Sequence, residues 1–185
     1  NGFGANVVEE RVSALEREFS QLNLDCQRWL NDMSLAYRFS PEGVAEWTSR
    51  NKVYQILRQC WQRTGPLGPP APGMIRAQKL VLSGLPMDRH LLKMPRLRAS
   101  FDHVTSLDLQ NGQILSDQQH FLGNFRQLRD LNLWKNRLSD FPQVISDMPY
   151  LRVLTLSDNQ ISLTAESAAR LRAMSRLQVL KLDGN

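Results

Sequence analysis

Apolar and polar residues alternate in a fixed frame along the C-terminal part of the chain. The frame has leucine at its first, fourth and sixth positions and asparagine at its ninth, and it occurs at Leu128–Asn136, Leu151–Asn159 and Leu177–Asn185. The frame starts are 23 and 26 residues apart. Two leucines separated by one residue point to the same side of a short strand, and the residues beside them point to the other side. An asparagine side chain can satisfy backbone groups where the chain leaves such a strand. We therefore expect one short strand in each frame.

Weaker copies extend the pattern towards the N-terminus. Val104–Leu109 fits the frame, although Gly112 stands at the asparagine position, and Ala77–Pro86 is a degenerate first copy. The pattern is typical of leucine-rich repeat proteins, in which a single repeat cannot bury its leucines and neighbouring repeats stack into a curved parallel sheet. We predict an α/β fold: a right-handed leucine-rich repeat solenoid, a horseshoe arc of about five repeats. Its strands are centred on Leu80, Leu107, Leu131, Leu154 and Leu180.

The N-terminal third has helical periodicity instead. Its apolar residues alternate in spacings of four and three: Val8, Val12, Leu15, Phe19, Leu22, Cys26, Trp29 and Met33. This stripe predicts one long helix that packs on a neighbouring element of the same chain, with a dimer seam as the alternative. A second helix is expected from about Pro41 to Arg63, since Ser40 can cap it and proline is favoured at the first helical position.

The prolines and glycines divide the chain. Residues 65–73 contain four prolines and three glycines, which is incompatible with helix or sheet. We predict an N-terminal α-helical region over residues 1–64, a linker over residues 65–73 and a leucine-rich repeat domain over residues 74–185. The helices should form a hairpin that covers the open first face of the repeats. Thr164–Ala173, rich in helix formers behind a capping threonine, should form a helix on the back of the repeats.

Composition narrows the class of protein. No apolar run approaches the length of a membrane span, and no signal peptide is visible after Asn1. The last residue, Asn185, is the asparagine of a frame, so we expect a fragment of a longer protein whose repeat array continues. Cys26 and Cys60 are expected to be buried thiols. Because the chain has no N-glycosylation sequon and no cysteine-rich cap, we expect an intracellular or bacterial origin.

The net charge of +5 is concentrated in one stretch. Arg89, Lys93, Arg96 and Arg98 form a basic patch that is compatible with solvated loop charge, an acidic protein partner or a nucleic acid. The aromatic residues that stack on nucleic-acid bases are missing there, so we expect no nucleic-acid partner.

No catalytic constellation is visible. His90, His103 and His120 lack cysteine or carboxylate neighbours at metal-ligand spacing, and adjacent Asp102 and His103 are poorly placed to act on one reacting atom. We expect no catalytic residue, no metal and no cofactor in this stretch of protein.

The candidate binding residues are those that alternation places on the concave face of the sheet. They are Ser106, Asp108, Gln110, Asp130, Asn132, Trp134, Thr155, Ser157 and Lys181. Trp134 stands out among them because an aromatic residue on a solvated sheet face gains little from folding, whereas such residues are favoured anchors in interfaces. The competing interpretation is that Trp134 packs locally against lysine or arginine side chains.

The segment from about Trp47 to Asn185 resembles a bacterial family, the leucine-rich repeat proteins related to novel-E3-ligase effectors. The resemblance is carried by Ile56–Arg63, Leu80–Leu85, Phe101–Leu109 and Ile161–Thr164. It implies that the repeats recognise the substrate of an E3 ubiquitin ligase whose separate C-terminal helical domain carries a catalytic cysteine in a Cys-x-Asp setting. Neither Cys26 nor Cys60 matches that motif.

The resemblance further implies a virulence protein, cytoplasmic in a bacterium or secreted into a host cell, with a host protein as its partner. The alternative is a non-enzymatic leucine-rich repeat scaffold or adaptor. Neither interpretation involves insertion into a membrane, and the oligomeric state is left open.

Overall fold

The computed structural model describes residues 2–63, 78–85, 94–115 and 119–185. Three helices come first: α1 (Gly2–Leu30), α2 (Leu35–Arg38) and α3 (Pro41–Gln62). The predicted start of α3 is confirmed, because the Ser40 hydroxyl accepts a hydrogen bond of 3.1 Å from the Gly43 N–H. The predicted linker, residues 65–73, lies outside the described residues.

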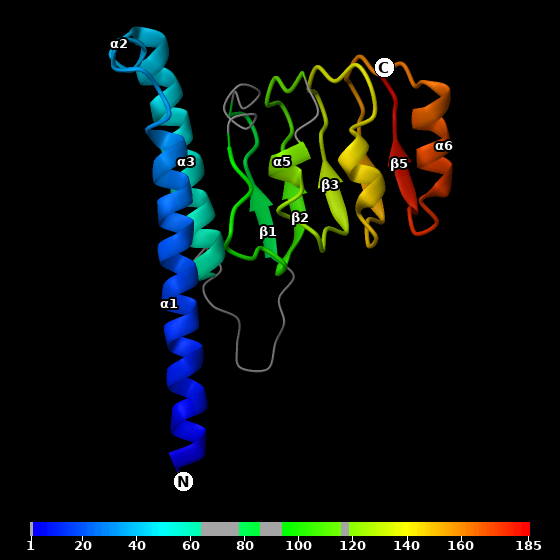
Figure 1. Cartoon of the computed structure of the whole chain (residues 1–185). Helices are drawn as coiled ribbons and strands as arrows, with labels where there is room; N and C mark the ends of the chain where they lie inside the picture. Colours follow the sequence, from blue (N-terminus) through cyan, green and yellow to red (C-terminus); the bar gives the residue numbers. More distant parts are fainter. Residues whose placement is uncertain (1, 64–77, 86–93, 116–118) are drawn as a thin grey trace.

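Helices α1 and α3 lie side by side as a hairpin, with α2 at its tip (Figure 1). Leu22, Cys26 and Trp29 on α1 are buried, as the apolar stripe predicts. The Tyr54 hydroxyl of α3 donates to Asn23 Oδ1 at 2.6 Å. The wholly buried guanidinium of Arg50 donates to the Trp29 carbonyl and to Glu46, so its charge is compensated inside the hairpin.

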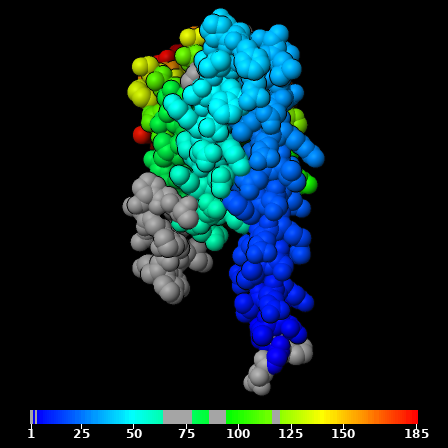
Figure 2. Space-filling view, turned by 90° about the vertical axis from the view of Figure 1, so that its left-hand side faces the viewer, coloured from blue at the N-terminus to red at the C-terminus, as the bar shows by residue number. Residues whose placement is uncertain are grey.

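The N-terminal half of the apolar stripe is exposed, which differs from the expected packing. Val8, Val12 and Leu15 are 62%, 48% and 48% exposed. The reason is length, because α1 has 29 residues and α3 has 22. Near the end of α3, the Trp61 ring stacks on Phe19 with 5.3 Å between ring centroids. Beyond this contact α1 projects away from the rest of the molecule (Figures 1 and 2).

The strands lie where the leucine frames predict them. They are β1 (Gln78–Val81), β2 (Val104–Asp108), β3 (Asp130–Asn132), β4 (Val153–Thr155) and β5 (Val179–Lys181). They form one parallel sheet in chain order, and the fourth-position leucines Leu80, Leu107, Leu131, Leu154 and Leu180 are in register across it. The structure is therefore of the α/β class, with one strand for each predicted frame.

Short helical segments connect the strands. They are α5 (Gln119–Leu122), the 3-10 helix η1 (Gln143–Asp147) and α6 (Ala165–Ala173). The predicted cap of α6 is confirmed, since Thr164 Oγ1 accepts from the Ser167 N–H at 3.1 Å. None of the helices in the described parts of the chain combines the length and apolar character that crossing a membrane requires.

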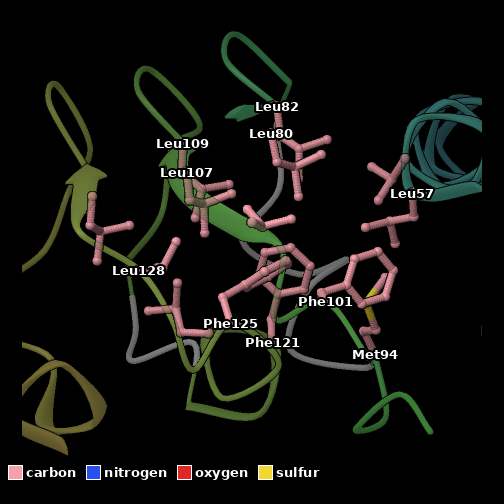
Figure 3. Close-up of a cluster of buried hydrophobic side chains, with 14 of the residues drawn as sticks. Leu57, Leu80, Leu82, Met94, Phe101, Leu107, Leu109, Phe121, Phe125 and Leu128 are labelled. Carbon is pink, nitrogen blue, oxygen red and sulfur yellow. The ribbon is translucent and has the colours of Figure 1, made fainter. Parts of the chain in front are cut away.

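One hydrophobic core joins the hairpin to the sheet. Leu57 of α3 points towards Leu80, Leu82, Phe101 and Met94 (Figure 3). The hairpin therefore covers the β1 end of the sheet, as expected from the sequence, and protects leucines that would otherwise meet water (Figure 1).

Polar contacts fix the angle at which the hairpin docks. Asp25 of α1 forms an ion pair of 2.9 Å with Arg98, and Glu18 accepts from the Ser100 N–H at 2.7 Å. The imidazole Nε2 of His103 lies 2.9 Å from the Cys60 carbonyl oxygen. These contacts join residues at least 43 positions apart in the sequence, so they form only when both parts are folded.

The ninth-position asparagines link each frame to the one before it. Asn136 Nδ2 donates to the carbonyls of Leu109 and Leu133, both at 3.0 Å, and its Oδ1 accepts from the Gly112 N–H at 2.9 Å. Asn159 repeats this arrangement one frame later, with the carbonyls of the sixth-position leucines of both frames. Because both asparagines are buried, these bonds satisfy backbone groups that water cannot reach.

We expect replacement of a sixth-position leucine to destabilise the whole sheet. Leu133 and Leu156 are each at most 1% exposed, so Leu133→Ala or Leu156→Ala leaves a cavity between neighbouring frames. The expected loss of unfolding free energy, measured by urea denaturation, is about 2–5 kcal/mol. Leu163→Ala, at a residue that is 39% exposed, is the matched control and should cost less than about 0.5 kcal/mol. Equal losses at buried and exposed leucines would show that the register is wrong.

Candidate functional site

The register of the sheet arranges the non-leucine frame positions in three rows. Third positions are Lys79, Ser106, Asp130, Val153 and Val179, and fifth positions are Val81, Asp108, Asn132, Thr155 and Lys181. Seventh positions, just beyond the strands, are Ser83, Gln110, Trp134, Ser157 and Asp183. Because the leucines between them in β1 to β4 are buried, the rows lie on the opposite face of the sheet, which we call the concave face. In the last strand, β5, Leu180 is 38% exposed. All of the residues predicted from strand alternation therefore lie on this one surface.

The predicted residues differ in how accessible they are. Trp134 and Lys181 are exposed, and Ser106, Gln110, Asp130, Asn132 and Thr155 are half-buried. Asp108 and Ser157 are buried, at 6% and 4% exposure. The accessible part of the concave face is therefore smaller than the set of residues that alternation places on it.

Asp108 and Ser157 have partners within the protein. Asp108 accepts from the backbone N–H of Gln110 at 3.0 Å and from its side-chain amide at 3.1 Å. The Ser157 hydroxyl donates to Asp183 of the next frame. Asn132 acts like Asp108, since its Oδ1 accepts from the Trp134 N–H at 2.9 Å. These side chains shape the turns that follow the strands, in the way that aspartate and asparagine side chains commonly do.

Trp134 lies on the concave face just beyond the end of β3, the middle strand of the sheet. Its indole Nε1 donates to Asp158 Oδ2 at 2.7 Å, and the Lys135 ammonium lies 5.8 Å from the centre of the ring. The side chain is nevertheless 37% exposed. The local packing against a lysine that the sequence allowed is thus present, yet a large aromatic surface stays open to solvent in a fixed orientation.

The backbone conformation after each strand explains this orientation. The eighth frame position has positive φ in every frame: Gly84, Asn111, Lys135, Asp158 and Gly184. Asp158 therefore turns its carboxylate towards Trp134 of the preceding frame, directly above Gly184. A Cβ at Gly184 would lie 2.1 Å from Asp158 Oδ1, so only glycine fits there while the carboxylate keeps its place.

Strand alternation does not identify Lys135 and Asp158, because both follow the strand. The repeating frame could have identified them, since both occupy its eighth position. Lys135 directly follows Trp134, and Asp158 is the equivalent residue of the next frame.

The predicted basic patch is only partly described. Arg89 and Lys93 lie outside the described residues. Arg96 donates to the Gly123 carbonyl at 3.0 Å, and Arg98 pairs with Asp25 in the contact between hairpin and sheet. The structure therefore gives Arg98 a role in docking the hairpin, and it does not bring Arg96 and Arg98 to the concave face with Trp134.

Both cysteines and the adjacent pair Asp102 and His103 lie in settings that suppress reactivity. Burial raises the pKa of both the Cys26 and the Cys60 thiols to about 12, which confirms that they are buried thiols. Burial also lowers the pKa of His103, so this imidazole is neutral near pH 7. Asp102 pairs with Arg126 and not with His103. Among the described residues, no cluster of potential metal ligands occurs.

The comparison with known families agrees with the geometry over the middle of the sheet. Residues 102–161 match the family described as leucine rich repeat. The chain therefore contains leucine-rich repeats, and repeats of this kind generally mediate interactions between proteins. No curated protein matches the chain.

We expect Gly184→Ala to displace the Asp158 carboxylate and release the Trp134 indole. The new methyl group strains a backbone with φ of +74° and occupies the space of Asp158 Oδ1. The indole Nε1–H resonance of Trp134, assigned with Trp134→Phe, should shift in the ¹H–¹⁵N NMR spectrum.

Gly84→Ala is the matched control, because its φ is +76° and nothing lies within 4 Å of the added Cβ. It should cost a comparable stability, about 1–2 kcal/mol, and leave the indole resonance in place. An unchanged resonance in Gly184→Ala would mean that Asp158 does not orient Trp134.

Proposed function

We propose that this chain is a protein-recognition module whose partner binds the concave face around Trp134. The observation that carries the proposal is the fixed, solvent-open indole, which Asp158 and Lys135 hold in one orientation. An anchor that is already ordered loses little conformational entropy on binding. Exposed tryptophans surrounded by hydrogen-bonding groups are frequent centres of protein interfaces.

The accessible neighbours of Trp134 supply the polar surround. Asp130 and Asn132 precede it on β3, and Thr155 lies beside Asn132 on β4. These side chains are half-buried, so a partner can reach their oxygen and nitrogen atoms without reordering long side chains. Lys181 extends this surface at β5, whereas Asp108 and Ser157 support it from beneath.

The finer proposal rests on the resemblance to novel-E3-ligase effectors. In it, the chain is a right-handed repeat solenoid that recognises the substrate of a bacterial effector ligase, with a host protein as partner. The division into a helical region over residues 1–64, a linker over 65–73 and a repeat domain over 74–185 belongs to the same proposal. The buried thiols of Cys26 and Cys60 support a separation of recognition from ubiquitin transfer.

A non-enzymatic scaffold is the second candidate, because the buried, protonated thiols of Cys26 and Cys60 fit a chain that only binds other proteins equally well. The sequence of the full-length gene separates the two candidates. A helical domain containing Cys-x-Asp supports the ligase, and its absence supports the scaffold.

Replacing the anchor should weaken binding without unfolding the protein. Trp134 lies outside the buried core cluster, so Trp134→Ala should leave the protein folded, with a melting temperature lowered only modestly. Affinity for a partner first isolated by capture on the wild-type chain, then purified and measured by calorimetry, should fall by about 2 kcal/mol or more.

Tyr150→Ala is the control for this experiment, since Tyr150 is 38% exposed but precedes β4 and is not part of the rows. It should bind as the wild type does. If Trp134→Ala binds with unchanged affinity while Arg96→Glu, which leaves the Arg98–Asp25 ion pair in place, loses it, the partner uses the basic patch and the concave-face proposal is wrong.

The chain itself should not carry ubiquitin. With a pKa of about 12, each cysteine is about one part in ten thousand thiolate at pH 8, because the raised pKa keeps the thiol protonated until far more alkaline pH. Incubation with ubiquitin, activating enzyme and conjugating enzyme should give no thioester on a non-reducing gel. A ubiquitin adduct that disappears in Cys26→Ala or Cys60→Ala would contradict the proposed separation.

A further inference from the structure

Two exposed arginines stand next to each other where the chain enters strands β3 and β4. Arg129 and Arg152 both occupy the second position of their frames. The Arg152 N–H donates to the Arg129 carbonyl at 2.9 Å, so the two residues are direct neighbours in the ladder between the strands. Neighbouring strands lie about 4.8 Å apart. We call this second-position edge of the sheet the N-terminal rim.

Neither guanidinium is neutralised within the described part of the protein. No ion pair or side-chain hydrogen bond of Arg129 or Arg152 occurs there. The nearest carboxylate in sequence, Asp130, is half-buried on the concave face and pairs with neither. Like charges on adjacent strand positions repel each other, so this arrangement is unfavourable in the isolated protein.

The adjoining edge shows how the protein compensates an arginine. Two positions before its frame, Arg126 donates to both carboxylate oxygens of Asp102 in the preceding frame, at 3.3 Å and 2.9 Å. Asp102 stands two positions before the frame that starts at Val104. An arginine and a carboxylate on adjacent frames therefore fit each other at this side of the sheet. Arg129 and Arg152 have no such carboxylate partner among the described residues.

We propose that the N-terminal rim binds an acidic segment of the protein partner, whose carboxylates lie between the Arg129 and Arg152 guanidinium groups. Guanidinium groups bind carboxylates through paired hydrogen bonds, and two adjacent arginines hold a carboxylate more specifically than one. The proposal rests on the proposed function, since it names the chemistry of the partner on the same sheet.

The position of the rim also gives the spacing in the partner. Trp134 lies five positions after Arg129, with the strand β3 between them, which at the usual rise of an extended chain corresponds to roughly 16 Å. A partner segment in extended conformation has the same rise per residue. Its acidic residue therefore stands about five positions from the residue that contacts Trp134.

The test uses the whole chain and defined probes. Fluorescein-labelled octaglutamate is the acidic peptide, octaglutamine is the neutral peptide, and a thymidine oligonucleotide with the same number of charges represents nucleic acid. Fluorescence anisotropy measures the affinity of each probe at low and at physiological salt. The variants are Arg129→Glu/Arg152→Glu and the milder Arg129→Gln/Arg152→Gln, each checked for an unchanged melting curve.

Arg137→Glu/Arg172→Glu is the matched control, because it changes the net charge equally. Both residues are exposed, lie away from the rim and have no side-chain partner in the described parts of the chain. We expect the wild type to prefer octaglutamate to octaglutamine, with an affinity that falls as salt rises. The rim variants should weaken octaglutamate binding by about tenfold or more, and the control by less than about twofold.

Three results would overturn the proposal. They are equal losses in the rim and control variants, equal affinity for octaglutamate and octaglutamine, and a higher rim-dependent affinity for the oligonucleotide, which would indicate a nucleic acid. Trp134→Ala should not change octaglutamate binding, because the probe offers nothing to the indole. If the rim variants bind octaglutamate as the wild type does, the Trp134 test of the proposed function is unaffected. If Trp134→Ala does not weaken partner binding, the octaglutamate test of the rim is unaffected.

Discussion

The buried asparagine amides are the interaction on which the arrangement of the sheet depends. Asn136 and Asn159 each bond to carbonyls of their own frame and of the preceding frame, and their oxygens accept from N–H groups of the preceding frame. Both side chains are buried, so losing one amide leaves several buried polar atoms unsatisfied, at about 1–3 kcal/mol for each. Leucine burial drives neighbouring frames together without direction. The asparagines give the stack its spacing and fix the turn beyond each strand.

The candidate site is a consequence of those turns. The eighth frame position takes positive φ in every frame, and the seventh position, which holds Trp134 in the third frame, is presented beside Asp158 of the next frame. The surface is then positively charged at one end of the strands and negatively charged at the other. Arg129 and Arg152 stand where the chain enters the sheet, and Asp158 and Asp183 stand where it leaves. An extended partner segment that runs along the strands would meet both ends.

Much of the fold follows from the sequence because leucine burial is periodic and local. The frames give the positions of the strands and their register, and Ser40 and Thr164 mark the starts of α3 and α6. The exposed half of the α1 stripe could not be predicted, since periodicity shows that a face is apolar but not how far its partner helix extends.

The sequence predicts which face of the sheet carries the candidate site, but it does not predict the contacts that the side chains make there. Strand alternation places Asp108 and Trp134 on the same face, yet the first is buried by its own bonds to Gln110 and the second is exposed. The bond between Trp134 and Asp158 joins two neighbouring frames, and the ion pair of Asp25 with Arg98 joins the hairpin to the repeat part of the chain. Contacts of this kind depend on how elements pack in three dimensions, which no pattern along the chain contains.

Hydrogen exchange monitored by mass spectrometry, with and without the purified partner, tests the central claim most directly. Binding on the concave face slows exchange in the segments from Arg129 to Asn136 and from Arg152 to Asn159, while α1 and α3 exchange as in the free protein. Protection confined to the helical hairpin, with these two segments unchanged, would contradict the account.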